Sequence, residues 1–222
     1  MYKRQPQHWT EIIPEGKDAI SGITIVGGKL FVTGVHDVLT ETRIFTLDGN
    51  ETGRISYPTL GSATELYGRE DANEGFYSFE SFIIPPAIYR YDIATGKTET
   101  FAKPTVPFAS DRYEVKQVFY KSKDGTSIPM FISSKKGVKR DGNTPTLMSA
   151  YGGFLVNLTP AWNPEYAWWM EQGGLYAPVS YTHLDVYKRQ LLRGAASSCG
   201  ADRGSANRER TADGCRSGRS II

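Results

Sequence analysis

One short stretch of the sequence combines residue types that could do chemistry. Tyr151 is followed by a Gly-Gly pair and then by Phe154. The apolar run before it, 146–150, is entered through Pro145, and such a run between breakers is typical of a strand buried on both faces. Adjacent glycines allow a sharp turn and a close approach by another group. Two interpretations stay open: the strand aims the Tyr151 phenol at a site, or both aromatic rings pack at the end of a core strand.

Other residue types needed for nucleophilic or metal-dependent catalysis are absent or poorly placed. No Gly-x-Ser-x-Gly elbow occurs, and Ser198 has alanine instead of glycine two positions before it. Asp124 precedes a glycine and is explained by a hairpin turn. The histidines are far apart and predict no metal site: they are His8, His36 and His183. We expect the first two at the surface or in packing.

Composition excludes several classes of partner. The 222 residues are 39% hydrophobic and 23% charged, as in a folded soluble protein of one or two domains. A formal charge of +2 is too small to indicate nucleic acid. No apolar run is long enough for a membrane span, and the first residues contain no apolar h-region of the kind expected in a signal peptide. Both cysteines, Cys199 and Cys215, lie near the C-terminus. We therefore expect no disulfide framework, metal, cofactor, nucleic acid or membrane partner.

Residues 8–102 predict a series of short antiparallel strands. The pairs Gly27-Gly28 and Asp48-Gly49 lie between apolar runs and are hairpin signals. A further strand is expected to end at Pro85-Pro86. Short strands with frequent turn signals predict a sandwich, a barrel or a propeller. This amount of chain suits about two four-stranded propeller blades.

A different organisation begins beyond the proline-containing linker 103–112. Residues 113–177 predict a hairpin, then the buried strand 146–150, then a helix over 165–172 that ends at Gly173-Gly174. A last strand opens at 175. This order is the opening of an α/β domain rather than of another blade.

Both ends of the chain depart from this pattern. The tetrapeptide Tyr-Lys-Arg-Gln occurs at 2–5 and again at 187–190, and residues 179–190 resemble translated adapter DNA. We therefore treat 1–7 and 178–222 as artefact and exclude them from fold reasoning. The Arg/Gly/Ser/Ala-rich tail from 191 predicts disorder and is most simply explained as DNA translated out of frame. A basic tail that contacts nucleic acid is the less favoured alternative.

Residues 8–177 resemble the prolyl oligopeptidases, serine peptidases that pair a seven-bladed propeller with an α/β-hydrolase domain. One departure is Ser149-Ala150, where the family commonly has Tyr-Gly. Gly153-Phe154 favours the prolyl-specific branch over the related oligopeptidase B. The strings that carry the resemblance are Ser81-Phe82 with Ile88–Asp92, Tyr113–Tyr120, Ser122–Ile132, Tyr151–Phe154 with Leu158–Pro160, and Gly173–Ala177.

The resemblance implies the last blades of a β-propeller in 8–102 and the N-terminal part of an α/β-hydrolase catalytic domain in 113–177. It implies that Tyr151 donates a hydrogen bond in the oxyanion hole and that Phe154 stacks on a substrate proline. The parent enzyme would be a monomer that cleaves short proline-containing peptides after proline, in the cytoplasm or, alternatively, the periplasm. Nucleophile, acid and base are missing from this chain, so we expect it to be an inactive fragment.

Two other interpretations stay open. The β pattern of 8–102 also suits a non-enzymatic propeller-type binding module with an unrelated C-terminal piece. A third possibility is a degenerate peptidase homologue retained as a binder. It differs from the fragment only in whether the tail from 178 onward is real protein.

Overall fold

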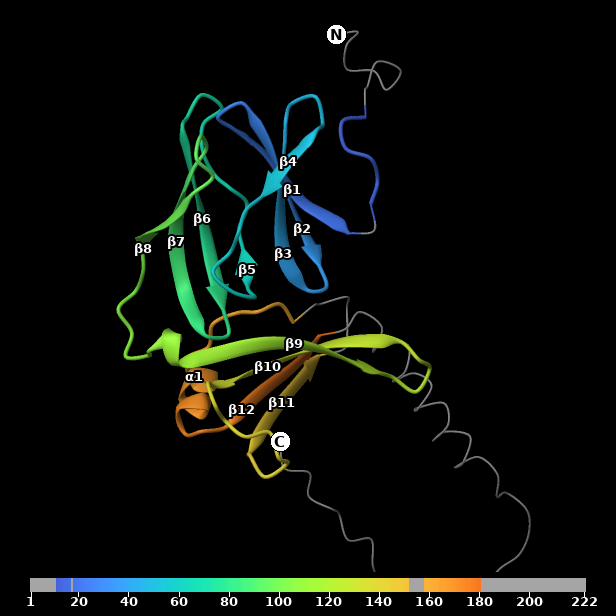
Figure 1. Ribbon diagram of the computed structural model, residues 1–222, viewed down its shortest axis with the longest axis vertical. Helices are drawn as coiled ribbons and strands as arrows, with labels where there is room; N and C mark the ends of the chain where they lie inside the picture. The colour runs from blue at the N-terminus through green and yellow to red at the C-terminus, as the bar shows by residue number, and fades with distance from the viewer. Residues whose placement is uncertain (1–10, 17, 152–157, 181–222) are drawn as a thin grey trace, which may run out of the picture. The chain divides into compact units, whose positions relative to one another are not determined.

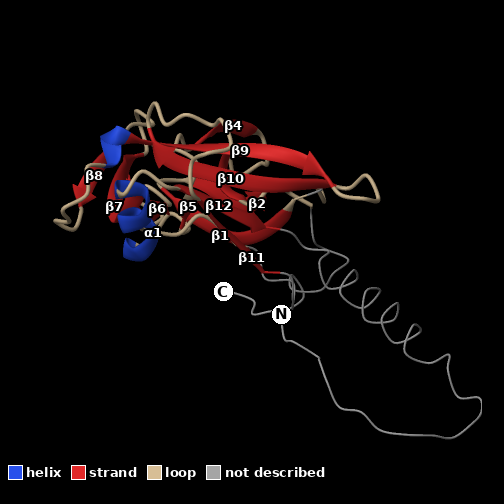
Figure 2. Ribbon diagram, turned by 90° about the horizontal axis from the view of Figure 1, so that it is seen from below, coloured by secondary structure: helices blue, strands red, loops and turns tan. Residues whose placement is uncertain are grey.

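The computed structural model describes residues 11–16, 18–151 and 158–180. Within these ranges the chain forms three four-stranded sheets. The first two are antiparallel, and their strands follow one another in the order of the sequence. The third sheet is mixed and carries a helix (Figures 1 and 2).

The first sheet, here called sheet I, confirms the predicted hairpins. Its first loop is the pair Gly27-Gly28, whose φ angles of 56° and 70° are the left-handed values that a two-residue hairpin turn requires. Gly49, in the last loop, also has a positive φ of 88°. The strands are β1 (Ala19–Val26), β2 (Lys29–His36), β3 (Leu39–Phe45) and β4 (Glu51–Arg54).

The second sheet, sheet II, corrects one prediction. Pro85-Pro86 does not end a strand. The chain turns earlier, at Phe82-Ile83, and both prolines lie inside β7. Glu80 alone stands opposite the two prolines in the register, which is a β-bulge, and a bulge tolerates residues without a ladder N–H. The strands are β5 (Ser62–Ala63), β6 (Glu74–Ser81), β7 (Ile84–Asp92) and β8 (Thr98–Ala102).

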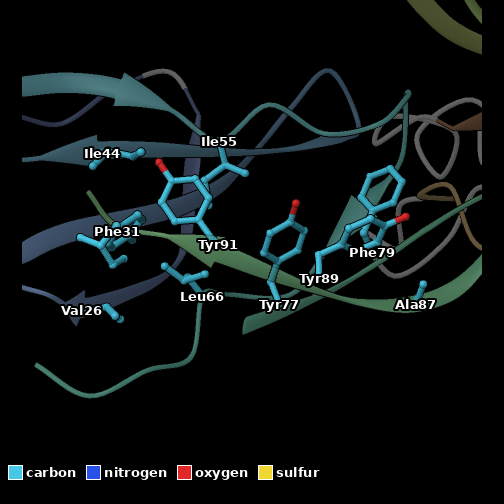
Figure 3. Close-up of a cluster of buried hydrophobic side chains, with 11 residues drawn as sticks. Val26, Phe31, Ile44, Ile55, Leu66, Tyr77, Phe79, Ala87, Tyr89 and Tyr91 are labelled. Atoms are coloured by element: carbon cyan, nitrogen blue, oxygen red, sulfur yellow. The ribbon is translucent and has the colours of Figure 1, made fainter. Parts of the chain in front are cut away.

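Sheets I and II share a hydrophobic core, shown in Figure 3. Phe31 of sheet I meets Tyr91 of sheet II edge to face, with ring centroids 5.9 Å apart. Within sheet II, Tyr77 and Tyr89 are directly opposite in the register and their rings stack at 5.5 Å. Such aromatic pairs stabilise both the cross-strand contact and the contact between sheets. The expectation of about two four-stranded blade-like sheets is met by these two.

The third sheet, sheet III, has the strand order β11-β12-β10-β9. It is preceded by a 3-10 turn, Ser110–Arg112. β9 and β10 form an antiparallel hairpin, and β11 and β12 are parallel. The helix α1 connects the parallel strands and packs on β12 and β10 (Figure 2). The elements are β9 (Tyr113–Lys121), β10 (Ser127–Lys135), β11 (Thr146–Tyr151), α1 (Pro164–Glu171) and β12 (Leu175–Ser180).

Helix α1 confirms the predicted helix, and its ends follow from local residues. The Asn163 side chain accepts a hydrogen bond from the Glu165 N–H at 2.7 Å, and Pro164 takes the first helical position. Gly173, with a φ of 90°, ends it.

The prediction that 146–150 is a strand buried on both faces is wrong. Among the described strands β11 lies at the edge and pairs with β12 alone, and Leu147 and Met148 are 39% and 63% exposed. The strand buried along its whole length is β12, because β11 and β10 flank it. β12 also continues to Ser180, three residues past the expected boundary at 177.

A second core joins the hairpin turns of sheets I and II to sheet III. Val38, from the β2–β3 turn, and Phe82, from the β6–β7 turn, belong to the same buried cluster as Phe131 of β10. The Phe82 and Phe131 ring centroids lie 5.4 Å apart. The Gln117 side chain of β9 donates a hydrogen bond to the Asp37 carbonyl at 2.6 Å.

Candidate functional site

Tyr151, the predicted oxyanion donor, is the last residue of β11. It stands opposite Ser180, the last residue of β12, in the parallel register. The carboxyl ends of both parallel strands therefore meet at one edge of sheet III, where α/β sheets usually bind their ligands. Tyr151 is 44% exposed. A phenol in this position is a hydrogen-bond donor accessible from solvent.

Phe154, the predicted substrate-binding residue, belongs to the segment 152–157 and lies outside the described residues. The described chain resumes at Leu158, whose N–H donates a hydrogen bond to the buried Ser180 hydroxyl oxygen at 2.9 Å. Ser180 therefore lies beside Tyr151, with which it pairs, and beside Leu158, to which it is hydrogen-bonded.

A second contact fixes the chain after this segment. The Trp162 N–H donates a hydrogen bond to the Glu80 carboxylate of sheet II at 2.7 Å. The Trp162 ring meets Phe108 edge to face, with centroids 4.8 Å apart. The intervening Pro160 is fully buried. Residues 158–163 are therefore attached to sheet III at one end and to sheet II at the other.

Helix α1 packs on the amino end of β12, the end opposite to Ser180. The rings of Tyr166 in α1 and Tyr176 in β12 stack with centroids 3.9 Å apart. Burial raises the pKa of Tyr176, with a further contribution from its hydrogen bond to Tyr166. The Tyr176 hydroxyl therefore stays protonated and neutral across the physiological range. It packs β12 against α1 as a neutral group.

The histidine that the structure describes confirms the surface expectation. His36, at the end of β2, is joined to Asp18 by a 2.9 Å contact between Nδ1 and Oδ2. Its hydrogen bond with Asp18 raises the pKa of His36. The hollow beside this pair measures about 20 Å³, and its described lining contains no serine, threonine or cysteine. Among the described residues His36 therefore has no nucleophile to activate at that hollow.

The other residues considered for a triad do not form one in the described ranges. Asp124 accepts hydrogen bonds from the backbone and the side chain of Thr126, at 3.0 and 2.9 Å, as its expected place in a hairpin turn requires. These bonds, the backbone one first, lower the pKa of Asp124. Three further residues lie outside the described residues: His8, His183 and Ser198.

Two kinds of feature are absent from residues 11–16, 18–151 and 158–180. No group of His, Cys, Asp or Glu residues in these ranges has an arrangement that could hold a metal ion. No helix in the same ranges is long and apolar enough to cross a membrane.

Sequence reasoning missed the two residues that fix the ends of segment 158–163. Glu80 lies 82 residues before its partner Trp162, so no local pattern indicates the contact. Ser180 falls in the stretch excluded as adapter-like, although it forms the end of β12. An uninterrupted apolar run from 175 to 179 was the available signal that β12 extends further.

Comparison with known proteins gives consistent matches. Residues 1–104 match a family model described as the N-terminal β-propeller domain of prolyl oligopeptidase. A prolyl endopeptidase from Elizabethkingia miricola is 40% identical over 173 residues, which is 78% of this chain and 24% of that protein. A dual-function macrocyclase-peptidase from Amanita bisporigera is 32% identical over 175 residues, 76% of this chain and 24% of that protein. The chain thus spans about a quarter of the length of these curated relatives.

Solved structures also match this chain. A structure from a study of two prolyl endopeptidases superposes on it with a TM-score of 0.70 and 41% sequence identity. The match covers 79% of this chain and 26% of that chain. Prolyl oligopeptidase B from Galerina marginata, without ligand, gives a TM-score of 0.69 and 26% identity, over 75% of this chain and 25% of that one. Sheets I and II are therefore part of a β-propeller.

Proposed function

The chain belongs to the prolyl oligopeptidase family, and from that premise we propose that it is part of a serine peptidase that cleaves short peptides after proline. Sheets I and II are proposed to be the last propeller blades. Residues 113–177 are proposed to open the α/β-hydrolase catalytic domain. The observation that carries this proposal is the position of Tyr151 at the carboxyl end of a parallel strand pair.

The topology of sheet III supports the hydrolase assignment. The succession β11, α1, β12 is a strand, a helix and a parallel strand, which is the unit that builds α/β sheets. The sheet begins with the antiparallel hairpin β9–β10, so it is mixed rather than a further antiparallel meander. The matches to the two relatives named above are also too long to lie within 1–104, because they span 173 and 175 residues.

The chemistry of proline-specific cleavage assigns roles to two residues. When a serine attacks the carbonyl of the scissile bond, negative charge develops on the carbonyl oxygen. The Tyr151 hydroxyl donates a hydrogen bond to that oxygen, and it stabilises the transition state more than the uncharged substrate. Phe154 offers an aromatic ring on which the substrate proline stacks. The chain from Leu158 to Trp162 is hydrogen-bonded to Ser180 of β12 and to Glu80 of β6.

The 222-residue chain itself is proposed to be inactive. Acyl transfer at a peptide bond needs a nucleophile, a base and an acid that orients the base. The sequence contains no Gly-x-Ser-x-Gly elbow. The partners of the intact parent are short proline-containing peptides, and its proposed compartment is the cytoplasm.

A chimeric enzyme tests the roles of Tyr151 and Phe154. Residues 8–177 replace the matching segment of the Elizabethkingia miricola relative, which supplies the rest of the catalytic domain. We expect hydrolysis of a Gly-Pro anilide. We expect Tyr151→Phe to lower kcat by about 10²–10³-fold with little change in KM, because one oxyanion donor is lost. Phe154→Ala should mainly raise KM.

Tyr120→Phe is the matched control, since Tyr120 is a 40% exposed tyrosine on β9 of the same sheet. It should leave kcat and KM unchanged. Equal kcat values for the Tyr151→Phe and Tyr120→Phe chimeras would reject the oxyanion role. A chimera that folds but shows no hydrolysis at all would reject the peptidase assignment of this segment.

The alternative, a non-enzymatic propeller-type binding module, rests on the two complete four-stranded sheets. One long read of the source DNA across the codon for Ala177 separates the two functions. Continuation into a Gly-x-Ser-x-Gly elbow supports the peptidase. Recovery of the same tail through Ile222 favours the binding module.

A further inference from the structure

Glu80 of β6 reaches from sheet II to the chain that precedes α1. Its Oε2 atom accepts the Trp162 N–H at 2.7 Å, in a part-buried contact between residues 82 positions apart. A hydrogen bond to a carboxylate is charge-assisted, which makes it roughly twice as strong as one between neutral groups. The backbone of Trp162 is therefore fixed against a propeller sheet.

Apolar contacts fix the same short stretch of chain. Pro160 is fully buried. The Trp162 ring meets Phe108 edge to face at 4.8 Å between centroids. The Phe108 ring in turn stacks on Tyr113, the first residue of β9, at 4.2 Å. Trp162 thus contacts sheet II directly and is joined to sheet III through the linker, so its position depends on both.

This stretch is the continuation of the strand that ends at Tyr151. On its N-terminal side Tyr151 is fixed by the register of β11 with β12. On its C-terminal side the chain reaches the contact of Trp162 with Glu80. A group that stabilises a transition state must be held to within about 0.5 Å by the contacts around it. Because a misplacement of about 1 Å can cost about 10²-fold in rate, the contacts on both sides of Tyr151 matter for catalysis.

We propose that Glu80 is a positioning residue for the peptidase reaction: it fixes the chain at Trp162 and thereby places the Tyr151 hydroxyl in the oxyanion hole. In this role Glu80 contacts neither the substrate nor the reacting atoms. The inference rests on the proposed peptidase function and adds that a propeller residue sets the rate at the catalytic centre. Loss of Glu80 should lower kcat and leave KM unchanged, because the oxyanion donor acts when charge develops on the substrate.

The full 222-residue chain tests the positioning itself, independently of activity. With 3-fluorotyrosine in place of tyrosine, the ¹⁹F resonance that is missing from Tyr151→Phe belongs to Tyr151. We expect Glu80→Ala to shift or broaden this resonance. Gln117→Ala is the matched control, because it removes another hydrogen bond between a propeller sheet and sheet III, to the Asp37 carbonyl at 2.6 Å. The proposal is overturned if Glu80→Ala leaves the resonance unchanged or if Gln117→Ala changes it equally.

The chimera with the Elizabethkingia miricola relative tests the effect on the reaction. Rates are expressed per active serine, titrated with a fluorophosphonate, so that a loss of folded enzyme does not count. Glu80→Ala should lower kcat by about 10-fold to 10²-fold with KM unchanged. Glu80→Gln keeps an oxygen that accepts the Trp162 N–H and should retain most of kcat. If Glu80→Ala fails a near-ultraviolet circular dichroism check of folding, Glu80→Leu, which also lacks the acceptor, replaces it.

A double-mutant cycle in the chimera separates positioning from a general loosening of the structure. If Glu80 acts through the Tyr151 hydroxyl, Glu80→Ala should lower kcat no further once Tyr151→Phe is present. Losses that multiply would overturn the proposal, as would full kcat for Glu80→Ala alone or an equal loss for Gln117→Ala. Full kcat for Tyr151→Phe alone would instead reject the proposed oxyanion role, and this inference with it.

Discussion

The Glu80 carboxylate of sheet II accepts a hydrogen bond from the Trp162 backbone N–H at 2.7 Å. Glu80 is also the single residue opposite Pro85-Pro86 in the bulge between β6 and β7. The bulge that admits the two prolines therefore lies at the position whose side chain anchors the chain after Tyr151. This one residue links a propeller sheet to the candidate site.

The first prediction concerns that link. Glu80→Ala leaves the part-buried Trp162 N–H without its acceptor, and we expect the free energy of unfolding to fall by about 1–3 kcal/mol. Glu80→Gln retains an oxygen acceptor and should lose less. Glu74→Ala removes only an exposed pair with Arg90, for which about 0–1 kcal/mol is expected. Urea denaturation measures all three, and an equal loss for Glu80→Ala and Glu74→Ala would contradict the link.

The second prediction concerns the core that joins the three sheets. Phe131 is fully buried and contacts Phe82 across the sheets. Phe131→Ala leaves a cavity there, and we expect a loss of about 3–5 kcal/mol in the free energy of unfolding. Phe119→Ala is the control on neighbouring β9, where the ring is 49% exposed. It should cost about 1 kcal/mol or less. Similar thermal midpoints for both variants would show that Phe131 does not attach sheet III to sheets I and II.

The third prediction concerns pH. The hydrogen bond with Asp18 raises the pKa of His36 in the folded chain above its ordinary value of 6.5, and the charges of Asp37 and Glu41 act in the same direction. A raised folded-state pKa means that the folded chain binds the proton more tightly than the unfolded chain does. The stabilisation is fully present below pH 6.5 and is lost as pH rises through the folded-state pKa.

His36→Asn should remove this part of the pH dependence. Melting temperatures of the unmodified chain and the variant, measured between pH 5 and 8, should differ most at the acidic end and converge at the basic end. Because the pair is exposed, high salt should reduce the difference. Parallel melting curves over this range would rule out a contribution from His36.

The fourth prediction concerns the start of α1. Asn163 caps the helix through its side-chain oxygen. Asn163→Ala should lower the free energy of unfolding by about 0.5–2 kcal/mol, since the Glu165 N–H loses its acceptor. Asn163→Asp preserves a capping oxygen and should be close to neutral. A loss for the aspartate variant as large as for alanine would show that the cap contributes little.

The elements best predicted from sequence are those determined by neighbouring residues. Gly27-Gly28 specifies a tight hairpin because both positions need a positive φ. Asn163 and Gly173 mark the ends of α1 for equally local reasons. The burial of β11 was predicted wrongly, because an apolar run does not show whether a strand has one neighbour or two.

Contacts between distant segments were beyond sequence reasoning. The bulge opposite Pro85-Pro86 depends on how β6 pairs with β7, so the prolines alone indicated a break. For the candidate site, the position of Tyr151 at a strand end followed from the Gly-Gly pair after it. The contacts that support this site could not be predicted from the sequence. Glu80 lies in another sheet, and Ser180 lies in a strand whose end was predicted too early.

The last prediction compares two serines that are both fully buried. The Ser180 hydroxyl oxygen accepts the Leu158 N–H at 2.9 Å, where the chain leaves the segment that begins at Tyr151. The Ser133 hydroxyl has no hydrogen-bond partner within the part of the chain that the structure describes. The same substitution to alanine therefore removes a hydrogen-bond acceptor at one position and an unpaired polar group at the other.

Ser180→Ala should lower the free energy of unfolding by about 1–3 kcal/mol, because the Leu158 N–H is left unsatisfied. Ser133→Ala should be neutral or slightly stabilising, because burying an unpaired hydroxyl is itself unfavourable. Hydrogen exchange gives an independent measurement: the Leu158 amide should exchange faster in Ser180→Ala and at an unchanged rate in Ser133→Ala. An unchanged Leu158 exchange rate in both variants would show that Ser180 does not hold the chain after Tyr151, and the anchoring role would then pass to Glu80 alone.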